Sequence, residues 1–193
     1  MPVPQGIGIF LAILFVLCYA VPQKRRECCC VGKDLCIDCD GGVVNIRVGA
    51  IIQKNGKFLM AGNPNFDYLY SVGGRIQFGE TAEQAVVREV REETGRDMEI
   101  DRLGFVTEDF FYGDQPSHLG KLIYELGYYF YMKTPADFEP VCESFTEAGE
   151  KEFLVWVSPE EKRKLYPVFF NDELRCPPAG VKHFVTDLVK TTP

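Results

Sequence analysis

Residues 73–96 read GGRIQFGETAEQAVVREVREETGR, and three glutamates, Glu89, Glu92 and Glu93, crowd together near the end of this stretch. On a helix, residues three or four positions apart are neighbours, so each like-charged pair costs about 0.2–0.5 kcal/mol. A cluster that weakens its own helix needs another reason to be there.

The same stretch predicts one long helix. Thr81 and Gln84 match a capping box, in which the two side chains satisfy main-chain N–H groups at the start of a helix. Gly95 is a favoured residue just past a helix end. We therefore expect the helix to begin after Thr81 and to end at Gly95.

The stripe of this helix that should face the core contains two of the glutamates. It begins with Ala82 and Val86 and continues with Glu89 and Glu93. The same spacing places Gln84, Arg88 and Arg91 on the solvent side. Buried carboxylates cost several kcal/mol without a cation, so the pattern indicates a divalent metal, and hard oxygen ligands select Mg²⁺ or Mn²⁺. The alternative from these residues alone is a surface helix with Arg88–Glu92 pairing.

The flanking residues resemble the signature of the Nudix hydrolase family. The match runs from Gly74 over five residues to Glu80, and over seven more to 88–95, which read REVREETG. Only the last position departs, because Arg96 stands where the family usually has an apolar residue. The likeness extends from about residue 43 to 190. It implies an α+β fold, an α/β/α sandwich with a mixed β-sheet and the catalytic helix after a Gly-Gly loop.

The resemblance also implies a reaction, the metal-dependent hydrolysis of a nucleoside diphosphate linked to another moiety, by attack of water on phosphorus. The metal ligands that it implies are the main-chain carbonyl of Gly74 and the carboxylates of Glu89, Glu92 and Glu93. It favours Glu89 as the residue that activates the water, oriented by Glu80 and Arg88. The alternative function is a catalytically silent Nudix-fold module that binds nucleotides or regulates, although all the signature glutamates are present.

An additional metal ligand is expected from the acidic loop before Trp156, because members of the family often supply one there. Glu150 is the first choice, and Glu147 and Glu152 are the alternatives.

Three residues are candidates for substrate binding. Tyr112 lies 16 residues after Arg96, where a tyrosine resembles the marker of the diadenosine polyphosphate subgroup, but an aromatic strand also explains it. Tyr70 precedes the glycine pair, and its ring can stack on a base or pack in a strand. Arg75, which follows Gly74, is the third candidate.

The first 33 residues form a separate apolar and cysteine-rich segment. Residues 7–21, IGIFLAILFVLCYAV, are shorter than the roughly 20 residues of a membrane span, and the basic residues 24–26 follow them. A signal peptide, a membrane anchor and an over-extended start site all stay open. If the segment inserts, the positive-inside rule keeps the rest of the chain cytoplasmic, tethered to the membrane.

The net charge of −7 argues against a nucleic-acid binder, because phosphate backbones require clustered Lys and Arg. A small nucleotide-type substrate is compatible with this charge, because a metal ion reverses the sign of a local site. We expect membrane contact only through residues 7–21, and homodimerisation stays open.

The rest of the chain predicts a strand-rich domain, 34–193. Asp40-Gly41-Gly42 and Asn55-Gly56 are signals of hairpin turns. The strands that we expect are 35–39, 43–52, 57–62, 67–72, 102–113, 122–133 and 152–158. Pro159 favours the start of a helix, and further short helices are expected towards the C-terminus, with His183 packed in one of them.

Overall fold

A computed structural model describes residues 32–113, 118–141, 149 and 151–190. The chain divides between Val31 and Gly32, and the fold described here is that of the second unit, Gly32–Pro193. Residues 7–21 lie outside the described residues, so their interpretation as a signal or an anchor stays a prediction. Neither helix in the described part of the chain has the length and apolar character to cross a membrane.

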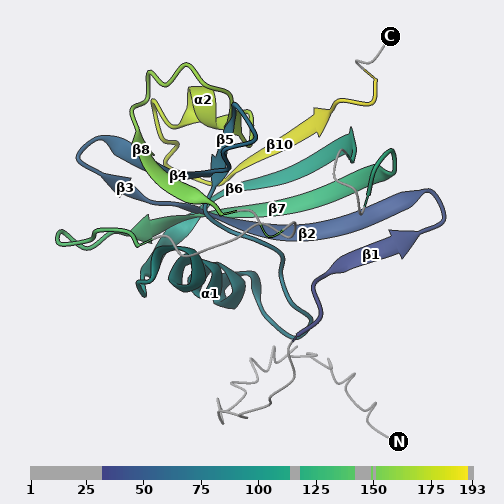
Figure 1. The fold of residues 1–193 in the computed structure, drawn as a ribbon, viewed down its shortest axis with the longest axis horizontal. Coiled ribbons are helices and arrows are strands. Elements are labelled where there is room, and N and C mark those ends of the chain that lie inside the picture. The colour runs from purple at the N-terminus through teal and green to yellow at the C-terminus, as the bar shows by residue number, and fades with distance from the viewer. Residues whose placement is uncertain (1–31, 114–117, 142–148, 150, 191–193) are drawn as a thin grey trace, which may run out of the picture. The chain divides into compact units, whose positions relative to one another are not determined.

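The described residues form two β-sheets and two helices (Figure 1). In chain order the elements are β1 (Cys36–Cys39), β2 (Gly42–Ile51), β3 (Gln53–Lys54), β4 (Lys57–Gly62), β5 (Leu69–Ser71), α1 (Ala82–Thr94), β6 (Glu99–Tyr112), β7 (Leu122–Lys133), β8 (Phe153–Val157), β9 (Leu165–Tyr166), α2 (Phe170–Glu173) and β10 (Lys182–Asp187). The first sheet has the strand order β1-β2-β7-β6-β10, and the second has β3-β4-β5-β9 with β8 paired to β4. The first sheet is mixed, because β2 and β7 pair in parallel whereas β6 and β7 pair antiparallel. The predicted α+β class is confirmed.

Helix α1 forms where the capping pattern predicts it. Thr81 Oγ1 accepts a hydrogen bond from the main-chain N–H of Gln84 at 3.2 Å, and the Gln84 side chain accepts one from Thr81 N at 2.9 Å. Gly95 ends the helix with a left-handed backbone, φ 70°, which glycine adopts without strain. The predicted start and end of the helix are therefore confirmed.

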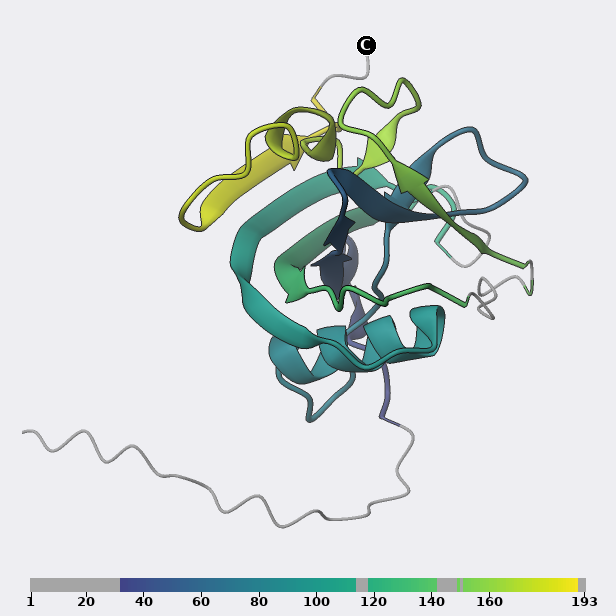
Figure 2. The same cartoon turned by 90° about the vertical axis from the view of Figure 1, so that its left-hand side faces the viewer.

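The two faces of the first sheet have different partners. Side chains alternate along a strand, so Val48 and Ala50 of β2 point to one face, where they pack with Val86 and Val90 of α1. On the other face Tyr129 of β7 packs with residues of the second sheet and of α2. Figure 2 shows the long strands β6 and β7 curving between α1 on one side and α2 on the other. Helix α1 is thus fixed to the sheet by an apolar stripe.

The C-terminal third differs from the sequence prediction. Residues after Pro159 form a turn, in which the Glu161 carboxylate accepts hydrogen bonds from the main-chain N–H groups of Lys162 and Arg163. These contacts satisfy locally the donors that a helix would use. His183 lies in the strand β10, which pairs in parallel with β6, and its side chain is 53% exposed. The expected helical packing of His183 is wrong because a pairing distant in sequence decides this segment.

Candidate active site

A turn of two glycines brings the chain from β5 to the helix. Gly73 has φ 144°, and a Cβ added to it would lie 2.2 Å from the carbonyl oxygen of Val48. A Cβ on Gly74 would lie 2.5 Å from Glu89 Oε1. The main-chain carbonyl of Gly74 accepts a hydrogen bond from Val48 N at 2.9 Å, which holds the turn along β2. Only glycine fits at position 73, because the main chain of β2 lies against it, whereas a side chain at position 74 would displace the Glu89 carboxylate.

Two glutamates of α1 point inward at this turn, as the stripe predicts. Glu93 is buried, and its Oε1 accepts a hydrogen bond from the main-chain N–H of Gly73 at 2.9 Å. Burial raises the pKa of Glu93 to about 8, and the Gly73 N–H only partly offsets this. The side chain of Glu89 is 13% exposed, and burial raises its pKa as well, opposed by the charge of Arg88.

Arg88 joins the carboxylates of the site instead of facing solvent, which corrects the expectation from helical periodicity. Its Nε and Nη2 donate to the two oxygens of Glu80 at 2.7 and 3.0 Å, and its Nη1 donates to Glu89 at 2.7 Å and to Glu92 at 3.1 Å. Its Nη2 also donates to the main-chain carbonyl of Arg75 at 3.0 Å. Burial of Glu80 opposes its ionisation, but the hydrogen bonds from Arg88, the hydrogen bond from Gln77 N and the charge of Arg88 together outweigh burial and lower the pKa of Glu80. The long, flexible side chain of Arg88 extends along the helix surface, which lets its guanidinium reach these partners.

The carboxylates are held by protein donors in this arrangement. Arg88 occupies oxygens of Glu89 and of the more exposed Glu92, while Glu93 accepts from Gly73. Within the described ranges, no three His, Cys, Asp or Glu side chains are grouped closely enough to hold a metal ion. The donor set still fits Mg²⁺ or Mn²⁺, because it consists of hard oxygens and the Gly74 carbonyl keeps a second lone pair.

The structure brings Glu152 towards Glu93. The Tyr70 hydroxyl donates a hydrogen bond to Glu152, and the negative charge of Glu152 contributes to the raised pKa of Glu93. Burial first, and then Glu152, raises the pKa of Tyr70. Glu150 and Glu147 lie outside the described residues. Of the three acidic residues that the sequence offers as an additional ligand, Glu152 is the one that the structure places beside the cluster.

The other two substrate candidates lie in different places. Arg75 is next to the cluster, and its Nε donates to Asn45 Oδ1 at 3.0 Å. Tyr112 is 55% exposed and ends β6 opposite Leu122. In β7, Gly127 is the partner of Arg47, which lies near the cluster. Leu122 is five residues away from Gly127 along the strand, which corresponds to roughly 16 Å at about 3.3 Å per residue. The structure does not bring Tyr112 together with the carboxylates.

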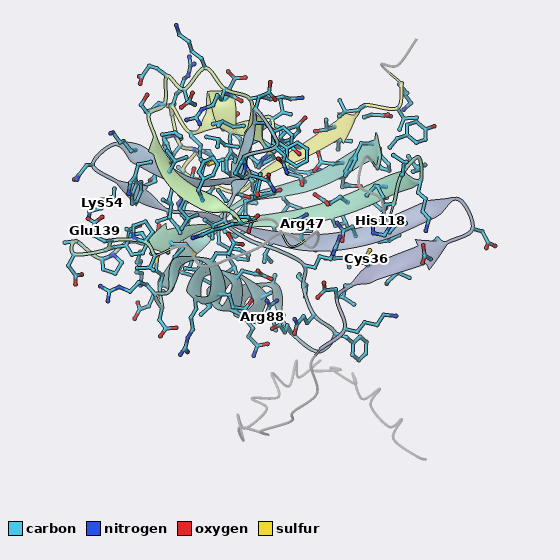
Figure 3. The ribbon with its side chains drawn as sticks, viewed as in Figure 1. Cys36, Arg47, Lys54, Arg88, His118 and Glu139 are labelled. Carbon is cyan, nitrogen blue, oxygen red and sulfur yellow. The ribbon has the colours of Figure 1, made fainter. Side chains whose placement is uncertain are left out.

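Sequence reasoning missed Arg47 of β2 (Figure 3). The main chain of Arg47 forms an isolated antiparallel β-bridge with Arg75. In the parallel ladder between β2 and β7, Arg47 is the partner of Gly127. Its guanidinium is partly buried, and its pKa is raised in spite of burial by the negative charges of Glu125 and, more weakly, of Glu89. It has no hydrogen-bond or ion-pair partner among the described residues. The signal in the sequence was a lone cation inside the apolar run 43–52.

The chain is similar to known proteins over most of its described part. A sequence profile of the NUDIX domain matches residues 44–173. Over 125 residues the chain is 29% identical to a CTP pyrophosphohydrolase from Escherichia coli (strain K12), covering 63% of this chain and 80% of that relative. Over 53 residues it is 43% identical to an ADP-ribose pyrophosphatase from Methanocaldococcus jannaschii, covering 26% of this chain and 31% of that relative.

Solved structures share the fold. The solution structure of the E. coli ORF135 protein matches with a TM-score of 0.50 and 28% identity, over 71% of this chain and 95% of that one. The crystal structure of a MutT protein from Bacillus halodurans matches with a TM-score of 0.51 and 18% identity, over 73% of this chain and 90% of that one. Because the sequence identity of the second match is only 18%, this match shows that the two proteins share a fold and nothing more.

The raised pKa of Glu93 predicts how the metal-free protein responds to pH. Glutamate in an unfolded chain has a pKa of about 4.3, so between about pH 4.3 and 8 the folded state holds a proton that the unfolded state lacks. Stability from this group is present below the unfolded pKa and is lost as pH rises towards 8. In chelator at pH 8, Glu93→Gln should therefore melt at or above the temperature of the unmodified protein.

The order should reverse with saturating Mg²⁺, because a ligand stabilises only the form that binds it, and turnover of Glu93→Gln should fall by orders of magnitude. Melting curves with and without metal, together with one rate, provide the measurement. Glu83→Gln removes the same charge from the exposed first turn of α1 and serves as the control. Lower stability of Glu93→Gln in chelator with an unchanged rate would contradict the metal interpretation.

The hydrogen bonds of Arg88 predict that Arg88→Lys lowers turnover. A lysine ammonium cannot donate to Glu80, Glu89 and the Arg75 carbonyl together. Loss of one or more charge-assisted hydrogen bonds, each about 1.5–3 kcal/mol, should reduce kcat by roughly tenfold to a hundredfold. We expect KM to stay within about twofold. Arg91→Lys is the control, because the Arg91 side chain is 70% exposed, and equal rates in both variants would leave Arg88 with no part in orienting Glu89.

Proposed function

Since the chain belongs to the Nudix hydrolase family and acts on the pyrophosphate bonds of nucleoside diphosphate derivatives, we propose that Glu89, Glu92, Glu93 and the Gly74 carbonyl hold Mg²⁺ or Mn²⁺ for that reaction. The observation that carries this proposal is the burial of Glu89 and Glu93 against the Gly73-Gly74 turn. Members of the family typically use a divalent metal, and two buried carboxylates on one turn are costly in its absence.

Each residue of the cluster has a distinct proposed role. A bound divalent ion lowers the pKa of water and offsets negative charge on phosphate oxygens. Glu89 accepts the proton of the attacking water, and burial, which raises the pKa of Glu89, makes its carboxylate a stronger base than an exposed one. Arg88 and Glu80 fix the direction of the Glu89 carboxylate through the hydrogen bond from Arg88 Nη1. Glu152, which interacts with Glu93, is our proposed additional metal ligand, and Glu150 stays a prediction because it lies outside the described residues.

Two arginines supply positive charge for the substrate. Arg47 lies in β2, and Arg75 follows the glycine turn. The two residues form an isolated β-bridge. Arg75 is engaged by Asn45, whereas the donors of Arg47 are unused among the described residues. A phosphate oxygen matches these donors in charge and geometry. We propose that Arg47 binds a non-bridging oxygen of the diphosphate, with Arg75 behind it and Tyr70 holding Glu152.

The similar proteins narrow the substrate to nucleotides. One relative is a CTP pyrophosphohydrolase and another is an ADP-ribose pyrophosphatase, so both are named for cleavage of a pyrophosphate bond next to a nucleoside. A nucleoside triphosphate and a nucleoside diphosphate sugar are therefore the first two classes to test. Tyr112 offers a third class, diadenosine polyphosphates, on the sequence marker alone.

A nucleotide panel tests the proposed function. CTP and other nucleoside triphosphates, ADP-ribose and a diadenosine polyphosphate are incubated with Mg²⁺ or Mn²⁺, and release of phosphate, pyrophosphate and nucleoside monophosphate is scored. We expect turnover of at least one substrate with metal and none in chelator. Glu89→Gln, prepared identically, should be inactive and controls for contaminating phosphatases. Nucleotide binding without turnover on any substrate would favour the catalytically silent module.

The position of Arg47 predicts a binding defect when its charge is removed. Arg47→Met keeps the length of the side chain and deletes the donors, so KM should rise by roughly tenfold to a hundredfold, the equivalent of about 1.5–3 kcal/mol. We expect a smaller change in kcat. Arg91→Met removes the same group from an exposed site and should leave KM unchanged. If Arg47→Met also leaves KM unchanged, then Arg47 only balances the charge of Glu125.

A further inference from the structure

We propose that Lys33–Leu35, here called the strap, is a positioning element of the active site: it pairs as an added strand with the loop Arg75–Phe78 and thereby sets the turnover rate. The inference rests on the proposed function, because the loop leads from the Gly73-Gly74 turn to Glu80. The strap precedes β1 and lies outside the part of the chain that resembles the family signature.

The strap and the loop form a short antiparallel ladder. Leu35 N donates to the carbonyl of Ile76 at 2.8 Å, and Phe78 N donates to the carbonyl of Lys33 at 2.8 Å. Asp34 and Gln77 are the bridge partners between these two hydrogen bonds. The ladder thus holds the loop at both of its ends by main-chain contacts.

The same loop supports the pair of residues that orients Glu89. The carbonyl of Arg75 accepts a hydrogen bond from Arg88 Nη2 at 3.0 Å, and Gln77 N donates to Glu80 Oε2 at 3.1 Å. A displacement of the loop main chain therefore moves both Arg88 and Glu80. The hydrogen bonds and ion pairs of Arg88 and Glu80 among the described residues do not include the strap, so the strap acts through the loop.

Other contacts hold the two halves of the loop unequally. Ile76 N donates to the carbonyl of Ile46 in β2 at 3.0 Å, and the Ile76 side chain is in the core. By contrast the side chain of Phe78 is 79% exposed, so packing does not fix the outer half. The hydrogen bond from Phe78 N to the Lys33 carbonyl ties this half to the strap, and the hydrogen bond from Gln77 N ties it to Glu80. Segments with few buried contacts open locally at low cost, which makes the loop sensitive to loss of one hydrogen bond.

Two matched pairs of full-length variants test the proposal. Phe78→Pro removes the N–H that donates to Lys33, whereas Phe78→Ala keeps it, and both lose the same exposed ring. Leu35→Pro removes the N–H that donates to Ile76, whereas Leu35→Ala keeps it and loses core packing. We expect each proline variant to have a kcat about three- to tenfold below its alanine partner, with KM within about twofold.

Hydrogen exchange provides a readout that does not depend on activity. The amides of residues 75–77, 79 and 80 should exchange faster in each proline variant than in its alanine partner, while the melting temperatures within a pair stay similar. Equal kcat values within both pairs, or unchanged exchange of these amides, would overturn the proposal. If the unmodified protein hydrolyses no nucleotide, the proposed function fails, and the exchange data still decide whether the strap holds the loop. If Leu35→Pro does not fold, the Phe78 pair gives the answer alone.

Discussion

The burial of two carboxylates against a turn without side chains is the constraint on which the rest of the site depends. Glu93 accepts a hydrogen bond from Gly73 N, a methyl group added to Gly73 would collide with the main chain of β2, and one added to Gly74 would meet the Glu89 carboxylate. Three other groups of the site offset the resulting negative charge. Arg88 donates to Glu89, Gly73 donates its N–H to Glu93, and Arg47 of β2 adds a positive charge that interacts with Glu89 and Glu93. The apolar face of α1 holds this unfavourable arrangement in place by packing on the sheet.

The supports of the site come from distant parts of the sequence. The turn is held by β2, the loop that follows it by the strap, and Glu93 is approached by Glu152 from the segment before β8. The site at helix α1 thus depends on three other segments of the chain: the strap, β2 and the segment before β8. A site built in this way is rigid where main-chain ladders meet and adjustable where only side chains meet, as for Glu92.

Local patterns were sufficient for the parts of the fold that depend on neighbouring residues. The capping box and Gly95 fixed both ends of α1, and the alternation of its stripe placed Glu89 and Glu93 inward. Periodicity failed for Arg88, because it locates a Cα and not the end of a long flexible side chain. It failed for β10 and His183, because parallel pairing with β6 is decided by residues about 75 positions away. Arg47 could not be assigned before the register of β2 against β7 and the glycine turn was known, since an arginine in a strand points to either face.

The metal-binding role that we propose for Glu93 has a thermodynamic consequence for the uptake of metal. A carboxyl group whose pKa is about 8 is mostly protonated at neutral pH, and a cation that binds to it must displace that proton. Binding of metal then releases acid into the solution, and the buffer takes it up. The heat measured by calorimetry will therefore depend on the ionisation enthalpy of the buffer, and the apparent affinity will weaken as the solution becomes more acidic. Metal and proton thus compete for the same carboxylate, so the fraction of protein with metal bound depends on pH.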